Sequence, residues 1–166
     1  RFCTDKKVIV AGSTWPDDEE ELDHYANTHP DIRFIIAPHE IYVSHLIEIE
    51  KLFKHTIRYS KLEQAIKNEP LTAFDTEANT LIIDNIGMLS KLYQYPTIAY
   101  IGGAFGEDGV HNVLEAAVYG KPVVFGPVYD KFQEAVDLVE NGGAYSVDNA
   151  LELEVIFDKL FNESDL

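Results

Sequence analysis

A histidine and a glutamate stand four residues apart in the central part of the chain, at His111 and Glu115. The apolar residues around them recur with the period of an α-helix, which predicts a helix with one buried face. The residues of that face are Val110, Val113, Leu114, Ala117 and Val118. His111 and Glu115 would lie one turn apart on the opposite face, near Asn112, where their side chains can act on one ligand.

A short apolar strand and a glycine-rich turn precede this helix. The strand is predicted at residues 98–101, and the glycines that follow it are Gly102, Gly103, Gly106 and Gly109. Such a turn often binds an anion, because backbone N–H groups and the positive end of the helix dipole converge there. Glu107 and Asp108 count against a bare polyphosphate, so a single phosphate flanked by a sugar fits better. Glu115 could accept hydrogen bonds from ribose hydroxyls. The glycines also fit a simple turn, with His111 and Glu115 on a solvated helix face.

Two other predicted strands end in polar residues. Residues 8–11 predict a buried strand, and Ser13 and Thr14 follow it just before an acidic helix start. Their hydroxyls either contact a ligand or cap that helix. Residues 33–37 predict the next strand, which runs into His39. Open α/β sheets bind ligands at the carboxyl ends of their strands, so His39 is a candidate binding residue.

The elements that must position these residues alternate along the chain. Further strands are expected at residues 56–59, 80–84, 123–125 and 144–147, and further helices at 41–53, from 60, from 89 to 95, at 130–140 and at 151–161. Alternation of this kind predicts an α/β fold, a Rossmann-like parallel sheet with helices on both faces. The turns after residues 12, 85 and 102 should then meet in one crevice at the carboxyl edge of the sheet.

Other parts of the chain are predicted to have structural roles. The helix at 41–53 should bury Val43, Leu46 and Ile47 in the core. The polar stretch 68–79 is predicted to be a mobile surface loop. The histidines outside any motif, which we expect at the surface, are His24, His45 and His55.

Composition excludes several classes of partner. The 13 basic and 29 acidic residues give a net charge of −16, which argues against unassisted binding to nucleic acid or to anionic lipid. Cys3 is the single cysteine, so no internal disulfide can form, and a reducing compartment is expected. No apolar run approaches the ~20 residues of a membrane span. No metal-ligand spacing is apparent, so no metal ion and no cofactor are expected.

The length of 166 residues fits one domain, and the opening RFCTDKK reads like the middle of a protein. We therefore interpret residues 1–166 as a fragment of a larger enzyme, forming one donor-binding domain. The segment GGAFG…HNVLEAAVYGKPVVFGP resembles the donor-binding half of the 3-deoxy-D-manno-octulosonic acid (Kdo) transferases, which move Kdo from CMP-Kdo to lipid A precursors. More loosely, E-A-x-x-x-G-x-P-V resembles the ribose-binding helix of two-domain GT-B glycosyltransferases. The resemblance runs from AGST to GGAYSV and implies the C-terminal half of a GT-B fold.

The resemblance also implies which residues contact the donor. It places Ser13 and Thr14 against the donor and His39 near its charged part, while Ile86 and Gly87 border the pyrimidine. The donor-binding residues expected in all are Ser13, Thr14, His39, Ile86, Gly87, Gly103, His111, Asn112 and Glu115. The roles of Glu40, which could cap a helix, and of Lys131, where many family members have Asn, stay open.

In a Kdo transferase an acceptor hydroxyl attacks the anomeric carbon and CMP leaves, so the site must stabilise charge on the departing phosphate. The resemblance implies that helix N-terminal amides around His111 and Asn112, with His39 nearby, supply this stabilisation. The catalytic base, the lipid A precursor site and any membrane contact are expected in a missing N-terminal half. The complete enzyme would then work at the cytoplasmic face of the bacterial inner membrane, while residues 1–166 alone would be soluble and inactive.

Two other functions fit the same residues. The lobe could belong to another GT-B enzyme, such as a UDP-sugar transferase or epimerase. It could also be a nucleotide-binding module without catalysis, since a fold alone does not fix a function.

Overall fold

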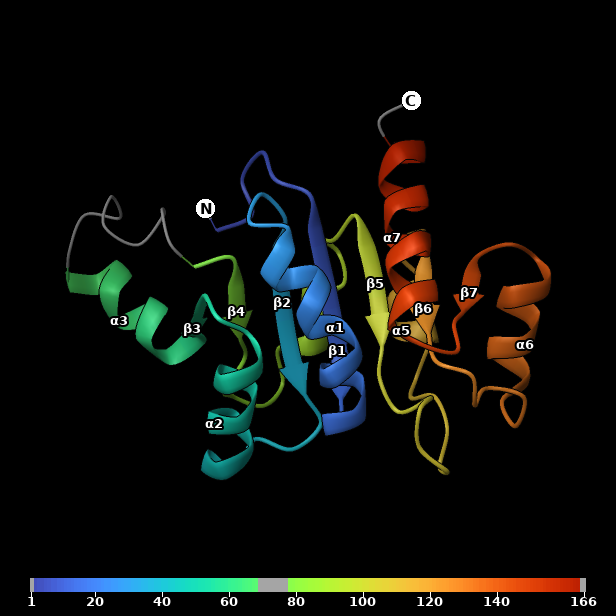
Figure 1. The fold of residues 1–166 in the computed structure, drawn as a ribbon, viewed down its shortest axis with the longest axis horizontal. Coiled ribbons are helices and arrows are strands. Elements are labelled where there is room, and N and C mark those ends of the chain that lie inside the picture. The colour runs from blue at the N-terminus through green and yellow to red at the C-terminus, as the bar shows by residue number, and fades with distance from the viewer. Residues whose placement is uncertain (1, 69–77, 165–166) are drawn as a thin grey trace.

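The computed structural model describes residues 2–68 and 78–164, and most of the predicted loop at 68–79 lies outside these ranges (Figure 1). Within them, seven parallel strands form one sheet in the order β3-β4-β2-β1-β5-β6-β7. The strands are β1 (Val8–Thr14), β2 (Arg33–Pro38), β3 (Thr56–Arg58), β4 (Thr80–Ile82), β5 (Ile98–Ile101), β6 (Val123–Phe125) and β7 (Ala144–Ser146). The helices are α1 (Pro16–Thr28), α2 (Val43–Leu52), α3 (Tyr59–Asn68), α4 (Leu89–Leu92), α5 (Leu114–Ala117), α6 (Gln133–Glu140) and α7 (Ala150–Ser164). The predicted α/β fold with a parallel sheet is confirmed.

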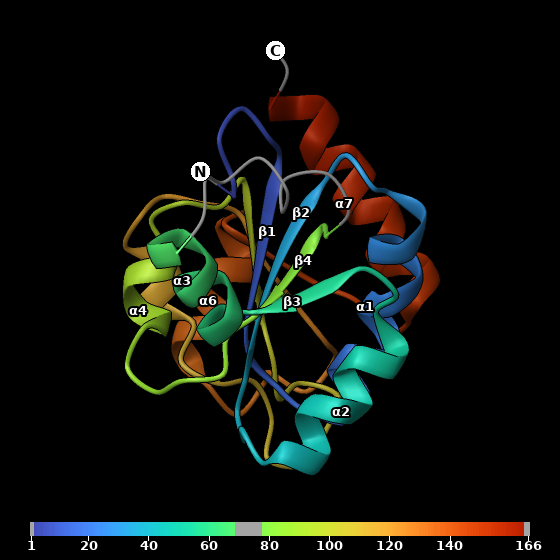
Figure 2. The ribbon, with the colours of Figure 1, turned by 90° about the vertical axis from the view of Figure 1, so that its left-hand side faces the viewer.

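Helices cover both faces of the sheet (Figure 2). The alternation of side chains along β1 explains this, since Ile9 packs in the core under α1, α2 and α7, while Val10 packs in the core under α3 to α6. Both side chains are fully buried. A strand that is buried on both faces has a continuous run of apolar residues, and such runs are the pattern from which this sheet was predicted.

The side of β1 to which strands are added changes between β1 and β5. From β1 the chain proceeds to β2, then to the edge strand β3, and back to β4 between them. The strands β5, β6 and β7 are added on the other side of β1. In open α/β sheets, ligands bind outside the carboxyl ends of the strands at such a point. Here those ends are in contact, because the amide of Gly102 donates to the carbonyl oxygen of Gly12 at 2.8 Å.

The central helix is much shorter than predicted. Only Leu114–Ala117 is helical, and Leu114 and Val118, expected on the buried face, are 50% and 74% exposed. Two hydrogen bonds explain the difference. The amide of Val110 donates to the carbonyl of Val128, and the amide of His111 donates to the carbonyl of Gly102. These bonds hold the preceding residues as a loop and prevent an earlier helix start.

Helix α2 also differs from prediction in its buried face. Leu46 and Ile49 are buried, but Val43 and Ile47 are 67% and 43% exposed. The prediction for Val43 and Ile47 was wrong because the helix presents a narrower stripe to the sheet than its apolar residues suggested.

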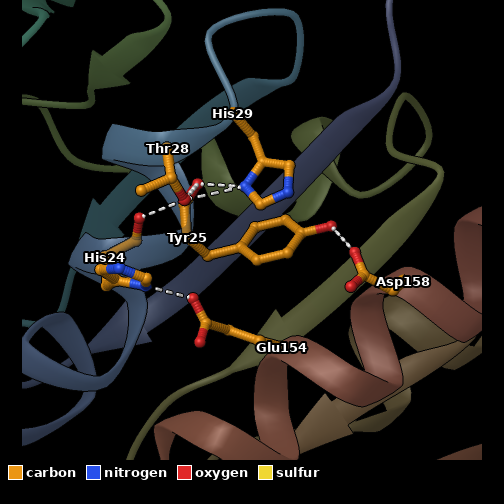
Figure 3. A network of polar contacts seen from close by, with 6 residues as sticks. All are labelled: His24, Tyr25, Thr28, His29, Glu154 and Asp158. Atoms are coloured by element: carbon orange, nitrogen blue, oxygen red, sulfur yellow. Dashed lines mark hydrogen bonds and ion pairs between the residues drawn. The ribbon is translucent and has the colours of Figure 1, made fainter.

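Helix α7 packs against α1 (Figure 3), on the face of the sheet opposite to α4 and α6 (Figure 2). The hydroxyl of Tyr25 donates to Asp158 at 2.8 Å, and Nδ1 of His24 lies 2.6 Å from Oε1 of Glu154. Phe157 packs edge-on against the ring of Tyr25, with 5.1 Å between ring centroids. Burial, followed by the neighbouring Asp158, raises the pKa of Tyr25, so its hydroxyl stays protonated and available as a donor.

Candidate functional site

Several backbone amides of the glycine turn donate hydrogen bonds within the protein. The amide of Gly103 donates to Asp18 at 3.1 Å, and that of His111 donates to the carbonyl of Gly102 at 3.0 Å. The other amides of the turn that donate to protein carbonyls are those of Gly102, Gly106, Gly109 and Val110. The expected helix start at His111 is therefore wrong, because α5 begins only at Leu114, and the His111 amide already donates to Gly102. A role of the Asn112 amide stays a prediction.

Asp18 ties the glycine turn to the start of α1. Its buried carboxylate accepts hydrogen bonds from the hydroxyl of Tyr100 at 2.6 Å, the amide of Trp15 at 2.8 Å and the amide of Gly103. Burial raises the pKa of Asp18, while the hydrogen bonds from Tyr100 and from the two amides oppose the increase. One side chain thus fixes three segments that border the candidate site.

Three aromatic rings from three segments meet beside this turn. The ring of His39 stacks on that of Trp15, with 4.5 Å between centroids and 24° between planes. The ring of His111 contacts that of His39 in a tilted arrangement, at 4.5 Å and 43°. Trp15 joins β1 to α1, His39 follows β2, and His111 follows the glycine turn. The structure therefore brings the two predicted histidines side by side at the carboxyl edge of the sheet.

The environment of His111 disfavours its charged form. Burial lowers the pKa of His111, and the neighbouring His39 lowers it further, whereas Asp108 and Glu115 oppose the decrease. A negatively charged ligand beside both rings would reverse this balance, because it would stabilise each imidazolium.

Two cavities meet at these rings. The larger, of about 660 Å³, is lined by His39, Asn112 and Phe132 among others. The smaller, of about 280 Å³, is lined by Asp17, Asp18 and Gly103 among others. Both are bordered by Trp15, Asp108, Gly109 and His111. Their size suits a small organic ligand of the nucleotide class.

Four of the predicted donor-binding residues therefore line a common site: His39, Gly103, His111 and Asn112. Gly103 has φ +99°, and a Cβ there would lie 2.5 Å from the carbonyl oxygen of Gly109 and 3.0 Å from the ring of His111. Glycine is thus required where the turn passes His111. The Asn112 side-chain oxygen accepts a hydrogen bond from the amide of Leu114 at 3.1 Å, which orients it at the start of α5.

The other five do not line either cavity: Ser13, Thr14, Ile86, Gly87 and Glu115. Ser13 has φ +54° at an irregularity in the β1–β2 pairing. Thr14 is fully buried, and its hydroxyl faces Glu19 at 3.5 Å. Trp15 is the N-cap residue of α1, so neither hydroxyl has the capping role considered from the sequence. Ile86 is 88% exposed.

Across residues 2–68 and 78–164, no three His, Cys, Asp or Glu side chains gather as a metal site would require. None of the helices described is long and apolar enough to cross a membrane.

Comparisons with known proteins agree with the resemblance seen in the sequence. No protein-family model matches the chain. The 3-deoxy-D-manno-octulosonic acid transferase of Chlamydia trachomatis serovar A is 31% identical over 99% of this chain, and that of Aquifex aeolicus is 29% identical over 89%. The chain is similar to a segment of the Kdo transferases. It spans 37% and 40% of the length of these two enzymes. It is also 31% identical to 24% of a bifunctional glycosyltransferase/methyltransferase of Fusobacterium nucleatum.

A solved structure shares the fold. The C-terminal CMP-Kdo binding domain of WaaA from Acinetobacter baumannii superposes with a TM-score of 0.79. The two sequences are 23% identical, and the match covers 98% of this chain and 84% of that one. The Rossmann-like architecture described above is thus the one found in that domain.

Sequence reasoning missed three residues that organise the region matched to the Kdo transferases. Trp15 and Asp18 were treated only as part of a helix start, although a tryptophan directly after a strand end could have indicated a position at the binding edge. His45, predicted at the surface, has a side chain only 13% exposed, and its Nε2 contacts the buried Glu19. This prediction was wrong because no local pattern shows that α1 and α2 meet there.

Proposed function

We propose that this chain is the donor-binding domain of a Kdo transferase, a GT-B glycosyltransferase that transfers Kdo from CMP-Kdo to a lipid A precursor in lipopolysaccharide biosynthesis. The observation that carries the proposal is the pair of imidazoles, His39 and His111, at a cavity beside the β1–β5 switch point. Similarity to Kdo transferases over nearly the whole chain supports it.

The site's contribution would be to stabilise the leaving group. As an acceptor hydroxyl bonds to the anomeric carbon and the bond from that carbon to the CMP oxygen breaks, negative charge grows on the phosphate. Protonated His39 and His111 can each donate a charge-assisted hydrogen bond to it. Asp108 and Glu115 oppose the decrease in the pKa of His111 that burial and His39 cause, and a bound phosphate would oppose it further.

The remaining residues complete the proposal. Gly103 and Asn112 shape the cavity wall, Ser13 and Thr14 are assigned to the donor, and Glu115 is assigned to the ribose. The exposed Ile86, with Gly87, is assigned to the cytosine. The base that takes the acceptor's proton and the lipid-binding surface belong to the part of the enzyme that this chain does not span. That complete enzyme would work at the cytoplasmic face of the inner membrane.

Calorimetric titration with CMP and with UMP tests the donor assignment. We expect CMP to bind more tightly than UMP, and we expect His39→Ala and His111→Ala each to weaken CMP binding about tenfold or more, the effect of losing one hydrogen bond to a charged group. His24→Ala, on the opposite side of α1 at the α7 contact, is the control and should bind CMP like the wild type. A preference for UMP, or unchanged affinity in both variants, would overturn the proposal.

A further inference from the structure

The loop that carries His39 is held by two hydrogen bonds. The amide of His39 donates to the carbonyl of Thr14 at 2.9 Å, which fixes the start of the loop against the end of β1. One residue further, the carbonyl of Glu40 lies 2.7 Å from Nδ1 of His45, on the first turns of α2. The position of the His39 ring against Trp15 therefore depends on contacts at both ends of this short segment.

The second nitrogen of His45 is held by a buried carboxylate. Its Nε2 contacts both carboxylate oxygens of Glu19, and the more distant one lies at 3.0 Å. Glu19 is 1% exposed, and the hydroxyl of Thr14 lies 3.5 Å from it. Burial raises the pKa of Glu19, and the hydrogen bond and charge of His45 oppose the increase.

The hydrogen-bond partners of His45 indicate where the protons of the His45–Glu19 pair lie. A carbonyl only accepts, so Nδ1 of His45 must carry a hydrogen and donate it to Glu40. The contact between Nε2 and Glu19 then needs one further proton, on the ring or on the carboxyl. The ring of His45 is thus fixed by hydrogen bonds at both nitrogens.

We propose that His45 is a positioning residue: its bond to the Glu40 carbonyl keeps His39 against Trp15 and His111 in the phosphate site, while its bond to Glu19 joins α1 to α2. The inference rests on the proposed function and deepens it. Neither His45 nor Glu19 touches the cavities around His111, although both line a neighbouring cavity of about 450 Å³ that Trp15 also borders. His45 acts through the loop.

A second histidine–glutamate pair on α1 provides the control. His24 and Glu154 join α1 to α7 with a 2.6 Å contact (Figure 3). Glu19 and His45 join α1 to α2 in the same way. The side chain of His24 is 68% exposed, and its pair has no link to the His39 loop among the contacts described. Both pairs join α1 to another helix, but only His45 is bonded to the His39 loop. A variant of His24 therefore shows the effect of losing a contact between helices without a change at His39.

Two conservative substitutions separate the two bonds of His45. In His45→Asn the amide nitrogen occupies the place of Nδ1, so the bond to the Glu40 carbonyl is kept and the bond to Glu19 is lost. In His45→Gln the amide occupies the place of Nε2, so the bond to Glu19 is kept and the bond to Glu40 is lost. We expect His45→Gln to bind CMP about tenfold more weakly, which is the loss of affinity that one hydrogen bond implies. Its thermal stability should be nearly unchanged. We expect His45→Asn to bind within about threefold of the wild type but to unfold at a lower temperature, because Glu19 loses its partner.

The readouts are calorimetric titration with CMP, thermal unfolding, and the NMR signals of the His39 imidazole. The His39 signals should shift in His45→Gln and stay in place in His45→Asn and His24→Ala. If affinity follows stability, so that His45→Asn binds weakly and His45→Gln normally, the positioning role is overturned while CMP binding stands. If the wild type does not bind CMP, the proposed function fails, and the His39 signals alone still decide whether His45 positions that ring.

Discussion

Asp18 joins three segments of the chain through one buried carboxylate. It accepts hydrogen bonds from Tyr100, Trp15 and Gly103, and an amide in its place would turn an NH₂ group toward some of these donors. We expect Asp18→Asn to lower the free energy of unfolding by about 1–3 kcal/mol, measured by urea denaturation at neutral pH. The exposed neighbour Asp17→Asn is the matched control and should change stability by less than about 0.5 kcal/mol. Equal effects at the two positions would contradict this role.

His111 predicts a pH dependence of stability with a definite sign. Its pKa in the folded protein lies below the ordinary value of 6.5, chiefly because of burial. The unfolded chain therefore binds the proton more readily, so this residue destabilises the fold at low pH, and the penalty disappears as the pH rises through 6.5. Relative to His111→Gln, the wild type should gain stability in urea denaturation between about pH 5 and 7. A loss over that interval would show that the folded protein favours the imidazolium.

At the scale of elements, glycines at the ends of β1 and β5 allow close neighbours, which are the α4 region at Gly12 and the end of β1 at Gly102. A Cβ on Gly12 would lie 1.8 Å from the hydroxyl oxygen of Tyr93, and a Cβ on Gly102 would lie 2.2 Å from the carbonyl oxygen of Ser13. The hydroxyl of Tyr93 can be removed by substitution, whereas the carbonyl oxygen of Ser13 belongs to the backbone and cannot.

We therefore expect Gly12→Ala to be strongly destabilising and Tyr93→Phe to relieve part of its effect. The relief is partial because the ring carbon Cζ of Tyr93 would still lie 2.8 Å from the new Cβ. A double-mutant cycle in urea should give a favourable coupling of about 1 kcal/mol or more. The same Tyr93→Phe change should not relieve Gly102→Ala. Additive effects of Gly12→Ala and Tyr93→Phe would contradict this prediction. They would mean that the new methyl group at position 12 does not meet the hydroxyl of Tyr93 in the folded protein.

The elements show which predictions the sequence supports and why others fail. Continuous apolar runs such as Val8–Ala11 are buried on both faces, so the strands and the parallel sheet could be predicted. The helix expected around Val110 could not, because its residues are held by hydrogen bonds to Val128 and Gly102, which are distant in sequence. The spacing of apolar residues predicts that a helix forms. Where the helix begins depends on which carbonyls accept hydrogen bonds from the backbone amides of its first residues.

The site was predictable to a similar extent. His39 and His111 each follow a predicted strand, and the sheet topology places them together. The supporting residues Asp18 and His45 could not be found, because their functions depend on contacts with Tyr100, Gly103 and Glu19 across different elements.

At the scale of the whole molecule, the net charge of −16 opposes an anionic ligand. The Debye length falls from about 30 Å at 0.01 M salt to about 8 Å at 0.15 M, so salt screens distant carboxylates more than contacts at the imidazoles. We expect CMP to bind about two- to fivefold more tightly at 0.15 M than at 0.01 M salt. Cytidine, which lacks the phosphate, is the control for calorimetry and should show little change. Weaker CMP binding at the higher salt concentration would contradict this prediction. It would mean that positively charged side chains near the site attract CMP more strongly than the net negative charge repels it.

The described chain begins and ends at the amino edge of the sheet (Figure 1). Lys7, just before β1, places its Nζ 5.4 Å from the ring of Phe161, so the start of β1 lies beside the last turns of α7. The ligand cavities open at the opposite edge, where β1, β2 and β5 end. Attaching the protein to a sensor chip or a bead by either end should therefore leave the cavities directed into the solution, accessible to nucleotides flowing past.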